Sequence, residues 1–335
     1  MKVFEIREFG IDRLALAERE IGAPIANRVL VRMAAASLNF RDCLMVSGKY
    51  NPKLKRPVVP LSDGSGVVEE IGPEVTRFKK GDRVAGCFFQ KWIEGPPTRE
   101  KALSALGGAI DGVLSEYRTF SEEGLVSVPE HLNFEEAAAL PCAAVTAWHA
   151  LFGHAPMTPG DTVLLQGTGG VSIFALQFAL AAGLRTIITS SSDEKLARAK
   201  ALGAHEVINY KSTPEWDVQA KKLTSGEGVG KVIEVAGSNT IPLSLRAVRT
   251  YGAVSVIGVL SGAAPAVAPT SLLMNSVQVQ GIYVGSRLMF ESMNKAIAFH
   301  GVKPVVDRTF IWTEIKEALR YMESQQHFGK ICLSF

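Results

Sequence analysis

The stretch Thr162–Ser172, TVLLQGTGGVS, decides the fold, because an apolar run of strand length leads directly into a glycine-rich turn. A helical pattern follows from Ile173 to Ala182. A strand that delivers such a turn to a helix N-terminus presents free backbone N–H groups and the positive end of the helix dipole to an anion. We therefore expect the pyrophosphate of a dinucleotide here, with a tight turn that binds no ligand as the structural alternative.

The turn matches the dinucleotide fingerprint GxGxxG at its first two positions. Its third position is Ser172, a small residue where helix and strand must pack closely. The residues expected to bind the phosphates are Gly167, Thr168, Gly169, Gly170 and Val171.

The end of the second strand, Thr186–Ser190, indicates which cofactor is preferred. Folds that prefer NAD place an Asp or Glu there for the ribose hydroxyls, whereas this chain has Ser190, Ser191 and Ser192. Hydroxyl groups donate to a 2′-phosphate, and Lys195 adds a positive charge nearby. The pattern favours NADP(H), although Ser191 or Ser192 could instead simply cap the helix that follows.

Length and composition narrow the class of protein. The 335 residues suit two domains, 47% of them are hydrophobic, and the formal net charge is only +3. Without a basic run, nucleic acid and membrane surfaces are not expected as partners. A charged N-terminus without an apolar segment predicts a cytoplasmic protein. Four scattered cysteines without a CxxC pair predict neither a disulfide framework nor a structural zinc cluster.

The hydrophobic period changes along the chain. The N-terminal part alternates like an antiparallel barrel, apart from a Gly- and Pro-rich stretch between Phe88 and Gly112 that we expect at the surface. Strands and helices then alternate as in a doubly wound α/β sheet. Six strands are expected, near Thr162, Thr186, Val207, Lys231, Val254 and Val277. These patterns predict a β-rich domain over 1–124, completed by 285–335, and a cofactor domain over 125–284.

This organisation resembles the medium-chain dehydrogenase/reductase superfamily across essentially the whole chain. Pro60–Gly72, PLSDGSGVVEEIG, is similar to the family signature GHExxGxVxxxG, and Leu140–Trp148 stands where the family enters its cofactor domain. The resemblance implies a GroES-like β-barrel catalytic domain and a six-stranded Rossmann domain.

Zinc-dependent alcohol dehydrogenases of this superfamily bind the catalytic metal through Cys, His and Cys. The matching positions here are Asn39, Ser62 and Cys142. Neutral Asn and Ser oxygens cannot replace a thiolate and an imidazole as zinc ligands. We therefore expect no metal site.

The segment Ser37–Asp42, followed by Ser47–Tyr50, resembles the enoyl-reductase modules of polyketide and fatty-acid synthases and zinc-lacking quinone oxidoreductases. The resemblance implies that Asn39 lies by the nicotinamide and that Tyr50 is a proton donor. Arg41 and Asp42 are further catalytic candidates, or form a local ion pair that braces the loop. Leu44 stands where quinone reductases usually have a tyrosine, which argues against quinone specificity.

Further positions follow from the resemblance alone. NADPH-dependent members hold the 2′-phosphate with a lysine and a tyrosine at the spacing of Lys195 and Tyr210, although Tyr210 would otherwise be a half-buried strand-end residue. The nicotinamide is expected to contact Thr146, Gly258, Val259, Leu260, Tyr283 and Val284. Three other positions are interpreted from the residues themselves. His327–Lys330 resembles a family segment near the cofactor, but Lys330 is expected as a surface charge, and His149 and His154 as ordinary helix-surface or loop residues.

Together these features predict a zinc-independent oxidoreductase that uses NADPH to reduce an enone, an enoyl compound or a quinone. A zinc-free alcohol or aldehyde dehydrogenase and an NADPH-binding structural or regulatory protein remain as alternatives, because the fold alone cannot choose. The last strand of the cofactor sheet, Val277–Val284, would be a bare edge in a monomer. We therefore expect a homodimer through the cofactor domain, a pairing that the family resemblance also implies.

Overall fold

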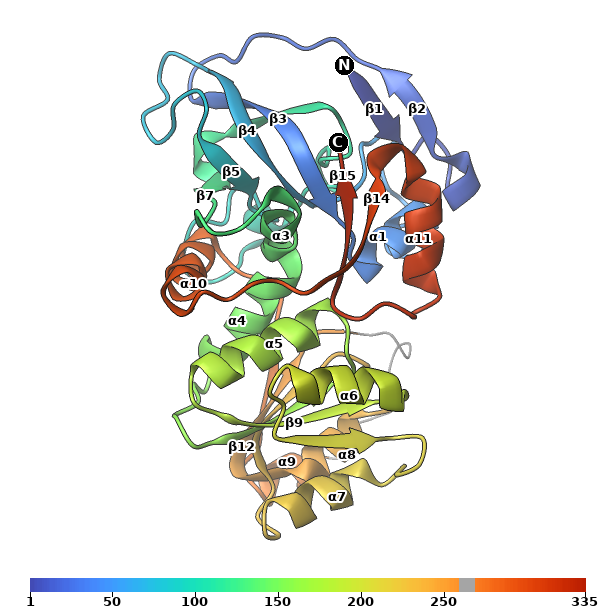
Figure 1. Ribbon diagram of the computed structural model, residues 1–335, viewed down its shortest axis with the longest axis vertical. Coiled ribbons are helices and arrows are strands. Elements are labelled where there is room, and N and C mark those ends of the chain that lie inside the picture. The colour runs from blue at the N-terminus through green and yellow to red at the C-terminus, as the bar shows by residue number, and fades with distance from the viewer. Residues whose placement is uncertain (259–268) are drawn as a thin grey trace. The chain divides into compact units, whose positions relative to one another are not determined.

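The computed structural model describes residues 1–258 and 269–335, and the chain forms two compact units (Figure 1). Unit 1 consists of Met1–Val145 and Val284–Phe335, and unit 2 of Thr146–Tyr283. The C-terminal segment thus belongs to the unit that contains the N-terminus. Unit 1 extends beyond residue 124 because helix α3 (Phe134–Ala138) packs against strands β3 and β4.

Unit 1 is built around a mainly antiparallel sheet. Its strands are β1 (Lys2–Glu5), β2 (Ala15–Glu18), β3 (Arg28–Ser37), β4 (Asp63–Ile71), β5 (Arg83–Gly86), β6 (Tyr117–Ser121), β7 (Leu125–Ser127), β14 (Val306–Ile311) and β15 (Lys330–Ser334). The main sheet has the order β14, β15, β3, β4, β5, β7, with β6 also paired to β3, while β1 and β2 pair separately. Two register shifts between β3 and β4 allow the long strands to bend, as a barrel-like sheet requires.

The helices of unit 1 are short apart from those in its C-terminal segment. They are α1 (Phe40–Val46), α2 (Arg99–Ala102), α3, α10 (Arg287–His300) and α11 (Ile315–Glu323). Asn133 and Glu136 form the expected capping box at the start of α3. Pro141 lies in a π-helical turn over Leu140–Ala144, because a proline cannot donate the backbone hydrogen bond that would continue an α-helix.

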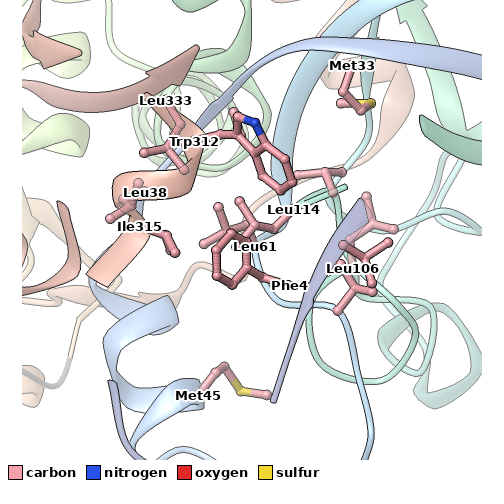
Figure 2. Packing of buried hydrophobic residues seen from close by; sticks show 14 of the residues in the cluster. Phe4, Met33, Leu38, Met45, Leu61, Leu106, Leu114, Trp312, Ile315 and Leu333 are labelled. Carbon is pink, nitrogen blue, oxygen red and sulfur yellow. The ribbon is translucent and has the colours of Figure 1, made fainter. Parts of the chain in front are cut away.

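The core of unit 1 joins residues from both ends of the chain. Figure 2 shows Phe4, Leu61 and Leu114 in one cluster with Trp312 and Ile315. Phe4 and Trp312 pack edge to face, with ring centroids 5.4 Å apart. Burial of such large apolar side chains, each contributing about 1.5–3 kcal/mol, ties the C-terminal segment to the N-terminal strands.

Unit 2 is the predicted doubly wound domain. Its strands are β8 (Thr162–Gln166), β9 (Arg185–Ser190), β10 (Glu206–Asn209), β11 (Val229–Glu234), β12 (Val248–Val256) and β13 (Gln278–Gly281). All pair in parallel in the order β10, β9, β8, β11, β12, β13, which confirms the six-stranded Rossmann sheet. Its helices are α4 (Val145–Phe152), α5 (Gly170–Ala181), α6 (Asp193–Ala201), α7 (Trp216–Leu223), α8 (Ile241–Ala247) and α9 (Pro269–Leu273).

The stretch between Phe88 and Gly112 is only in part the surface excursion that we expected, because residues 94–100 are exposed whereas other parts of it are buried. Trp92 and Leu106 are fully buried. The chain passes so close to Leu61 that a Cβ on Gly112 would lie 2.0 Å from the Leu61 carbonyl oxygen. Glycine here permits close approach of two backbone segments rather than an exposed turn, a distinction that composition cannot make.

No helix within the two described ranges is long and apolar enough to cross a membrane.

Candidate functional site

The glycine-rich turn connects β8 to α5 in unit 2. Gly167 has a φ of 73°, and a Cβ on Gly167 or Gly169 would meet no heavy atom of the described residues within 4 Å. Among the same residues, no side chain caps α5, which begins at Gly170, and its first turn carries no acid. The N–H groups of Thr168, Gly170 and Val171 therefore belong to an open turn at a positive helix end, which fits a pyrophosphate.

Ser172, at the third position of the fingerprint, is buried, and its hydroxyl donates a 2.6 Å hydrogen bond to the Gln166 carbonyl. The small side chain fastens α5 to the end of β8, as the close helix–strand packing at this position requires.

A buried carboxylate, which the sequence analysis missed, organises the ends of β8 and β11. Glu234 is fully buried, and its Oε1 accepts hydrogen bonds from the Thr240 hydroxyl at 2.7 Å and the Gly237 amide at 2.9 Å. Its Oε2 accepts from Gln166 Nε2 at 2.7 Å and the Ser244 hydroxyl at 2.5 Å. We call Glu234, Gln166, Thr240 and Ser244 the Glu234 cluster. The only signal in the sequence is an acid that directly follows the apolar pair Val232 and Ile233 at the end of a strand.

The carboxyl end of β9 brings the predicted 2′-phosphate residues together. The Tyr210 amide donates to the Ser190 carbonyl at 3.1 Å, so the ends of β9 and β10 lie side by side. Ser190 is buried, Ser191 and Lys195 are partly exposed, and Tyr210 is 42% exposed. The Ser192 hydroxyl accepts from the Lys195 amide, which confirms the capping alternative for that serine.

The positions expected to contact the nicotinamide differ in burial and in backbone conformation. Thr146 is buried, and a Cβ on Gly258 would lie 1.9 Å from the Val235 carbonyl oxygen, so that position requires glycine. Tyr283 is half-exposed, whereas Val284 is buried with a φ of 53°, a strained value for a β-branched residue. Val259 and Leu260 lie outside the described residues.

In unit 1, Asn39 stands at the start of α1 and is fixed from two directions. Its backbone N–H donates to Asp42 Oδ2 at 2.8 Å, and its side-chain Oδ1 accepts from Lys330 Nζ at 2.8 Å. Lys330 also donates to the Leu38 carbonyl at 2.6 Å and is only 2% exposed. The expectation that Lys330 is a surface charge is therefore wrong, because β15 pairs with β3 and carries this residue into the interior.

Asp63 is the acid that neutralises Lys330. It is fully buried, and its Oδ2 lies 3.9 Å from Lys330 Nζ. The Ser62 hydroxyl donates to Asp63 Oδ1 at 2.6 Å, and the Cys142 amide donates to Oδ2 at 3.0 Å. Burial raises the pKa of Asp63, while Lys330 opposes that shift. We call Asn39, Ser62, Asp63, Cys142 and Lys330 the Asn39 cluster.

The Asn39 cluster contains Asn39, Ser62 and Cys142, which the resemblance matched to the zinc ligands of alcohol dehydrogenases, but its donor atoms do not fit zinc. Asn39 Oδ1 accepts from an ammonium, and the Ser62 hydroxyl donates to a carboxylate. Burial and the nearby Asp63 raise the pKa of the Cys142 thiol above its ordinary value. A single cysteine beside the neutral oxygens of Asn39 and Ser62 does not supply the donor set that zinc requires. In the described part of the chain, no group of three or more His, Cys, Asp or Glu side chains could hold a metal ion.

Asp42 contacts this cluster through Asn39, Arg41 lies next to Asp42, and Tyr50 lies next to Arg41. Asp42 is buried, and burial raises its pKa to about 6, while Arg41 opposes the rise. Arg41 Nη1 lies 3.9 Å from Asp42 Oδ1, so the predicted ion pair exists but is long. The Arg41 guanidinium lies 5.5 Å from the centre of the Tyr50 ring, and Tyr50 is 46% exposed. The structure thus brings the four proposed catalytic residues into one part of unit 1.

His149 is also buried rather than on a helix surface, with its ring 5.3 Å from that of His154.

Models of known protein families match residues in both units. Residues 25–130 match the family model described as alcohol dehydrogenase GroES-like domain, and residues 170–299 match the model described as zinc-binding dehydrogenase. A zinc-type alcohol dehydrogenase-like protein of Schizosaccharomyces pombe is 46% identical, over 97% of this chain and 96% of its own.

Solved structures of other proteins are similar to this chain over its full length. A protein of Sinorhizobium meliloti 1021 described as an alcohol dehydrogenase has a TM-score of 0.94 and 41% identity, covering 100% of this chain and 98% of its own. A quinone oxidoreductase of Pseudomonas syringae pv. tomato DC3000 has a TM-score of 0.84 and 30% identity, covering 100% and 99%.

Proposed function

Because the chain belongs to the medium-chain dehydrogenase/reductase superfamily, we propose that it is a zinc-independent, NADPH-dependent oxidoreductase that reduces a conjugated acceptor. The acceptor class comprises enones, enoyl compounds and quinones. The observation that carries the proposal is the Asn39 cluster, in which an internal ion pair and its hydrogen bonds engage the positions that would otherwise bind zinc.

A conjugated acceptor suits a site without a metal. An isolated carbonyl needs a Lewis acid to accept hydride at carbon, whereas a conjugated acceptor moves the new negative charge onto its own oxygen. NADPH supplies the hydride when bound. The proton that completes the reduction comes from Tyr50, which is half-exposed, or from water.

The residues at the end of β9 support NADPH over NADH. Ser190 and Ser191 stand where NAD-preferring folds have a carboxylate for the ribose hydroxyls. Lys195 supplies a cation and Tyr210 a hydroxyl group. A 2′-phosphate gains charge-assisted hydrogen bonds from such groups.

A zinc-free alcohol dehydrogenase is the second candidate, because the names of relatives in both comparisons contain the words alcohol dehydrogenase. It requires a group that removes the proton from the alcohol, which the neutral Ser62 and Asn39 do not provide.

The experiment that tests the proposal measures turnover and metal content in one preparation. Protein purified without added zinc should oxidise NADPH with an enone or a quinone, contain far less than one zinc per chain, and keep its activity in a chelator. One tightly bound zinc per chain would contradict the metal assignment. Alcohol-dependent NADP⁺ reduction would favour the second candidate, and NADPH binding without turnover over a wide acceptor panel would favour a structural or regulatory protein.

A homodimer through unit 2 is part of the proposal. β13 pairs only with β12 among the described strands, all four of its residues are exposed, and Val279 is an exposed apolar residue on it. Such an edge pairs readily with its copy across a two-fold axis. Light scattering at micromolar concentration should give twice the mass of one chain, and a monomer would contradict the expectation.

A further inference from the structure

Arg41 is held firmly by the interior of unit 1. Its Nη1 donates to the Leu106 carbonyl at 3.0 Å, and its guanidinium lies 4.8 Å from the centre of the buried Phe88 ring. A Cβ on Gly108 would come within 2.5 Å of Arg41 Nη2, so glycine makes room for the guanidinium. With only 13% of its side chain exposed, Arg41 has one fixed position.

The Tyr50 ring is the exposed neighbour of this fixed cation. The guanidinium lies 5.5 Å from the ring centre, within the range of a cation–π contact. The Tyr50 amide donates to the Leu44 carbonyl at 3.1 Å, which anchors the backbone but leaves the side chain 46% exposed. The Arg41 guanidinium therefore lies within cation–π distance of both a buried aromatic ring and a half-exposed one.

We propose that Arg41 is a positioning residue that holds Tyr50 in the orientation from which it donates its proton. This inference rests on the proposed function, which makes Tyr50 the donor. In the step concerned, the Tyr50 O–H bond breaks, a C–H bond forms on the reduced acceptor, and the electron pair of the O–H bond remains on the phenolate until water returns a proton. Arg41 orients the ring beforehand and stabilises the negative charge that the ring then carries.

This role differs from both earlier interpretations of Arg41. A loop brace would act through Asp42, but that contact is 3.9 Å long, whereas the contacts to Leu106 and Phe88 already fix the side chain. A residue that binds substrate directly would keep its effect on kcat when Tyr50 is replaced by phenylalanine, which a double-mutant cycle measures.

A double-mutant cycle on turnover tests the inference. Arg41→Met should lower kcat with an enone about 5- to 30-fold in the wild-type background, the range from the strongest exposed cation–π contacts to desolvated ones. In a Tyr50→Phe background the same substitution should lower kcat less than about twofold, because the hydroxyl group that Arg41 positions is absent. Arg41→Lys should recover part of kcat, since it keeps the charge but loses the planar stack.

Unit 1 provides a matched control. The Arg308 guanidinium lies 4.6 Å from the Phe310 ring centre and 5.6 Å from that of Tyr321. Arg308 is exposed and is not one of the proposed site residues, so it repeats the arrangement without a proposed role in turnover. Arg308→Met should leave kcat unchanged in both backgrounds.

A second readout needs neither cofactor nor turnover. With ring-labelled tyrosine, the NMR signals of Tyr50 are assigned by their loss in Tyr50→Phe. Arg41→Met should move these signals in the protein alone, whereas Arg308→Met should move those of Tyr321 instead.

The outcomes separate this inference from the proposed function. If Arg41→Met lowers kcat equally in both backgrounds, or leaves the Tyr50 signals in place, the positioning role is wrong although the reductase assignment stands. If Tyr50→Phe turns over enones at the wild-type rate, the proton donor is wrong, and the catalytic role of Arg41 is overturned with it. Should Arg41→Met fail to fold, Arg41→Lys takes its place in the same cycle, and an effect independent of Tyr50 again overturns the inference.

Discussion

Replacing Lys330 by methionine tests how strongly the Asn39 cluster depends on its buried ion pair. Lys330 and Asp63 are 2% and 0% exposed, so water screens neither charge. Removing one partner of a buried pair costs about 3–5 kcal/mol, because the other charge stays buried without compensation. We expect the Lys330→Met variant to lose this much of the free energy of unfolding of unit 1.

The lower end of that range is the better expectation, because Asp63 keeps its hydrogen bonds from the Ser62 hydroxyl and the Cys142 amide. The double variant Lys330→Met/Asp63→Asn removes both charges and should recover most of the loss. It should remain about 1–2 kcal/mol below the wild type, because the Leu38 carbonyl and Asn39 Oδ1 lose their donor.

The pH dependence gives a third check on the same variant. Burial raises the pKa of Asp63, and removal of the ammonium should raise it further. A carboxyl whose pKa is raised in the folded state stabilises that state below its ordinary pKa, and this contribution is lost as the pH rises. The deficit of Lys330→Met should therefore shrink as the pH falls.

Urea unfolding followed by tryptophan fluorescence measures these differences unit by unit. Trp92 and Trp312 report on unit 1, while Trp148 and Trp216 lie in unit 2 and are replaced by phenylalanine in every protein compared. A loss below about 1 kcal/mol in Lys330→Met, or a double variant no more stable than the single one, would refute the reasoning.

Three further predictions follow from the site. Tyr50→Phe should keep NADPH affinity while lowering enone turnover by about 10²–10⁴-fold. Quinones should be less affected, because a reduced quinone takes protons from water. If the variant reduced enones at the wild-type rate, Tyr50 would only line the pocket. Lys195→Ala should weaken NADPH binding by about 1–3 kcal/mol without changing NADH binding. Fluorescence titration of both cofactors checks this, and equal affinities of the wild type for NADPH and NADH would contradict a 2′-phosphate site. Burial raises the pKa of Asp42 to about 6, above its ordinary 3.8. Neutral Asp42 therefore contributes its full stabilisation of the folded state below pH 3.8, and this contribution is lost as the pH rises through 6. Asp42→Asn should therefore gain on the wild type between pH 4 and 7 by up to about 3 kcal/mol in urea unfolding, and a constant difference would show that Asp42 stays ionised.

The parts of this protein that could be predicted from its sequence are those set by nearby residues. The turn at Gly167–Val171, the cap at Ser192 and the capping box at Asn133 each depend on residues a few positions apart. The six strands of unit 2 follow from apolar runs that are buried on both faces of a parallel sheet.

Burial of charged side chains could not be predicted in the same way. Lys330 contacts Asn39 across 291 positions in the sequence, and only the pairing of β15 with β3 brings them together. Glu234 reaches Gln166 across 68 positions. A lysine or a glutamate next to an apolar run usually ends at the surface, so its residue type indicates exposure unless the partner is known.

The Glu234 cluster has a practical consequence for redesign of the coenzyme preference. Its hydrogen bonds join β8, β11 and α8, and none of those described for the cluster involves Ser190, Ser191 or Tyr210. Substitutions at the end of β9 that introduce an acid should thus alter the preferred coenzyme while the proposed diphosphate-binding turn keeps its shape. Engineers could therefore exchange one coenzyme for the other at β9 alone and leave the ends of β8 and β11 as they are.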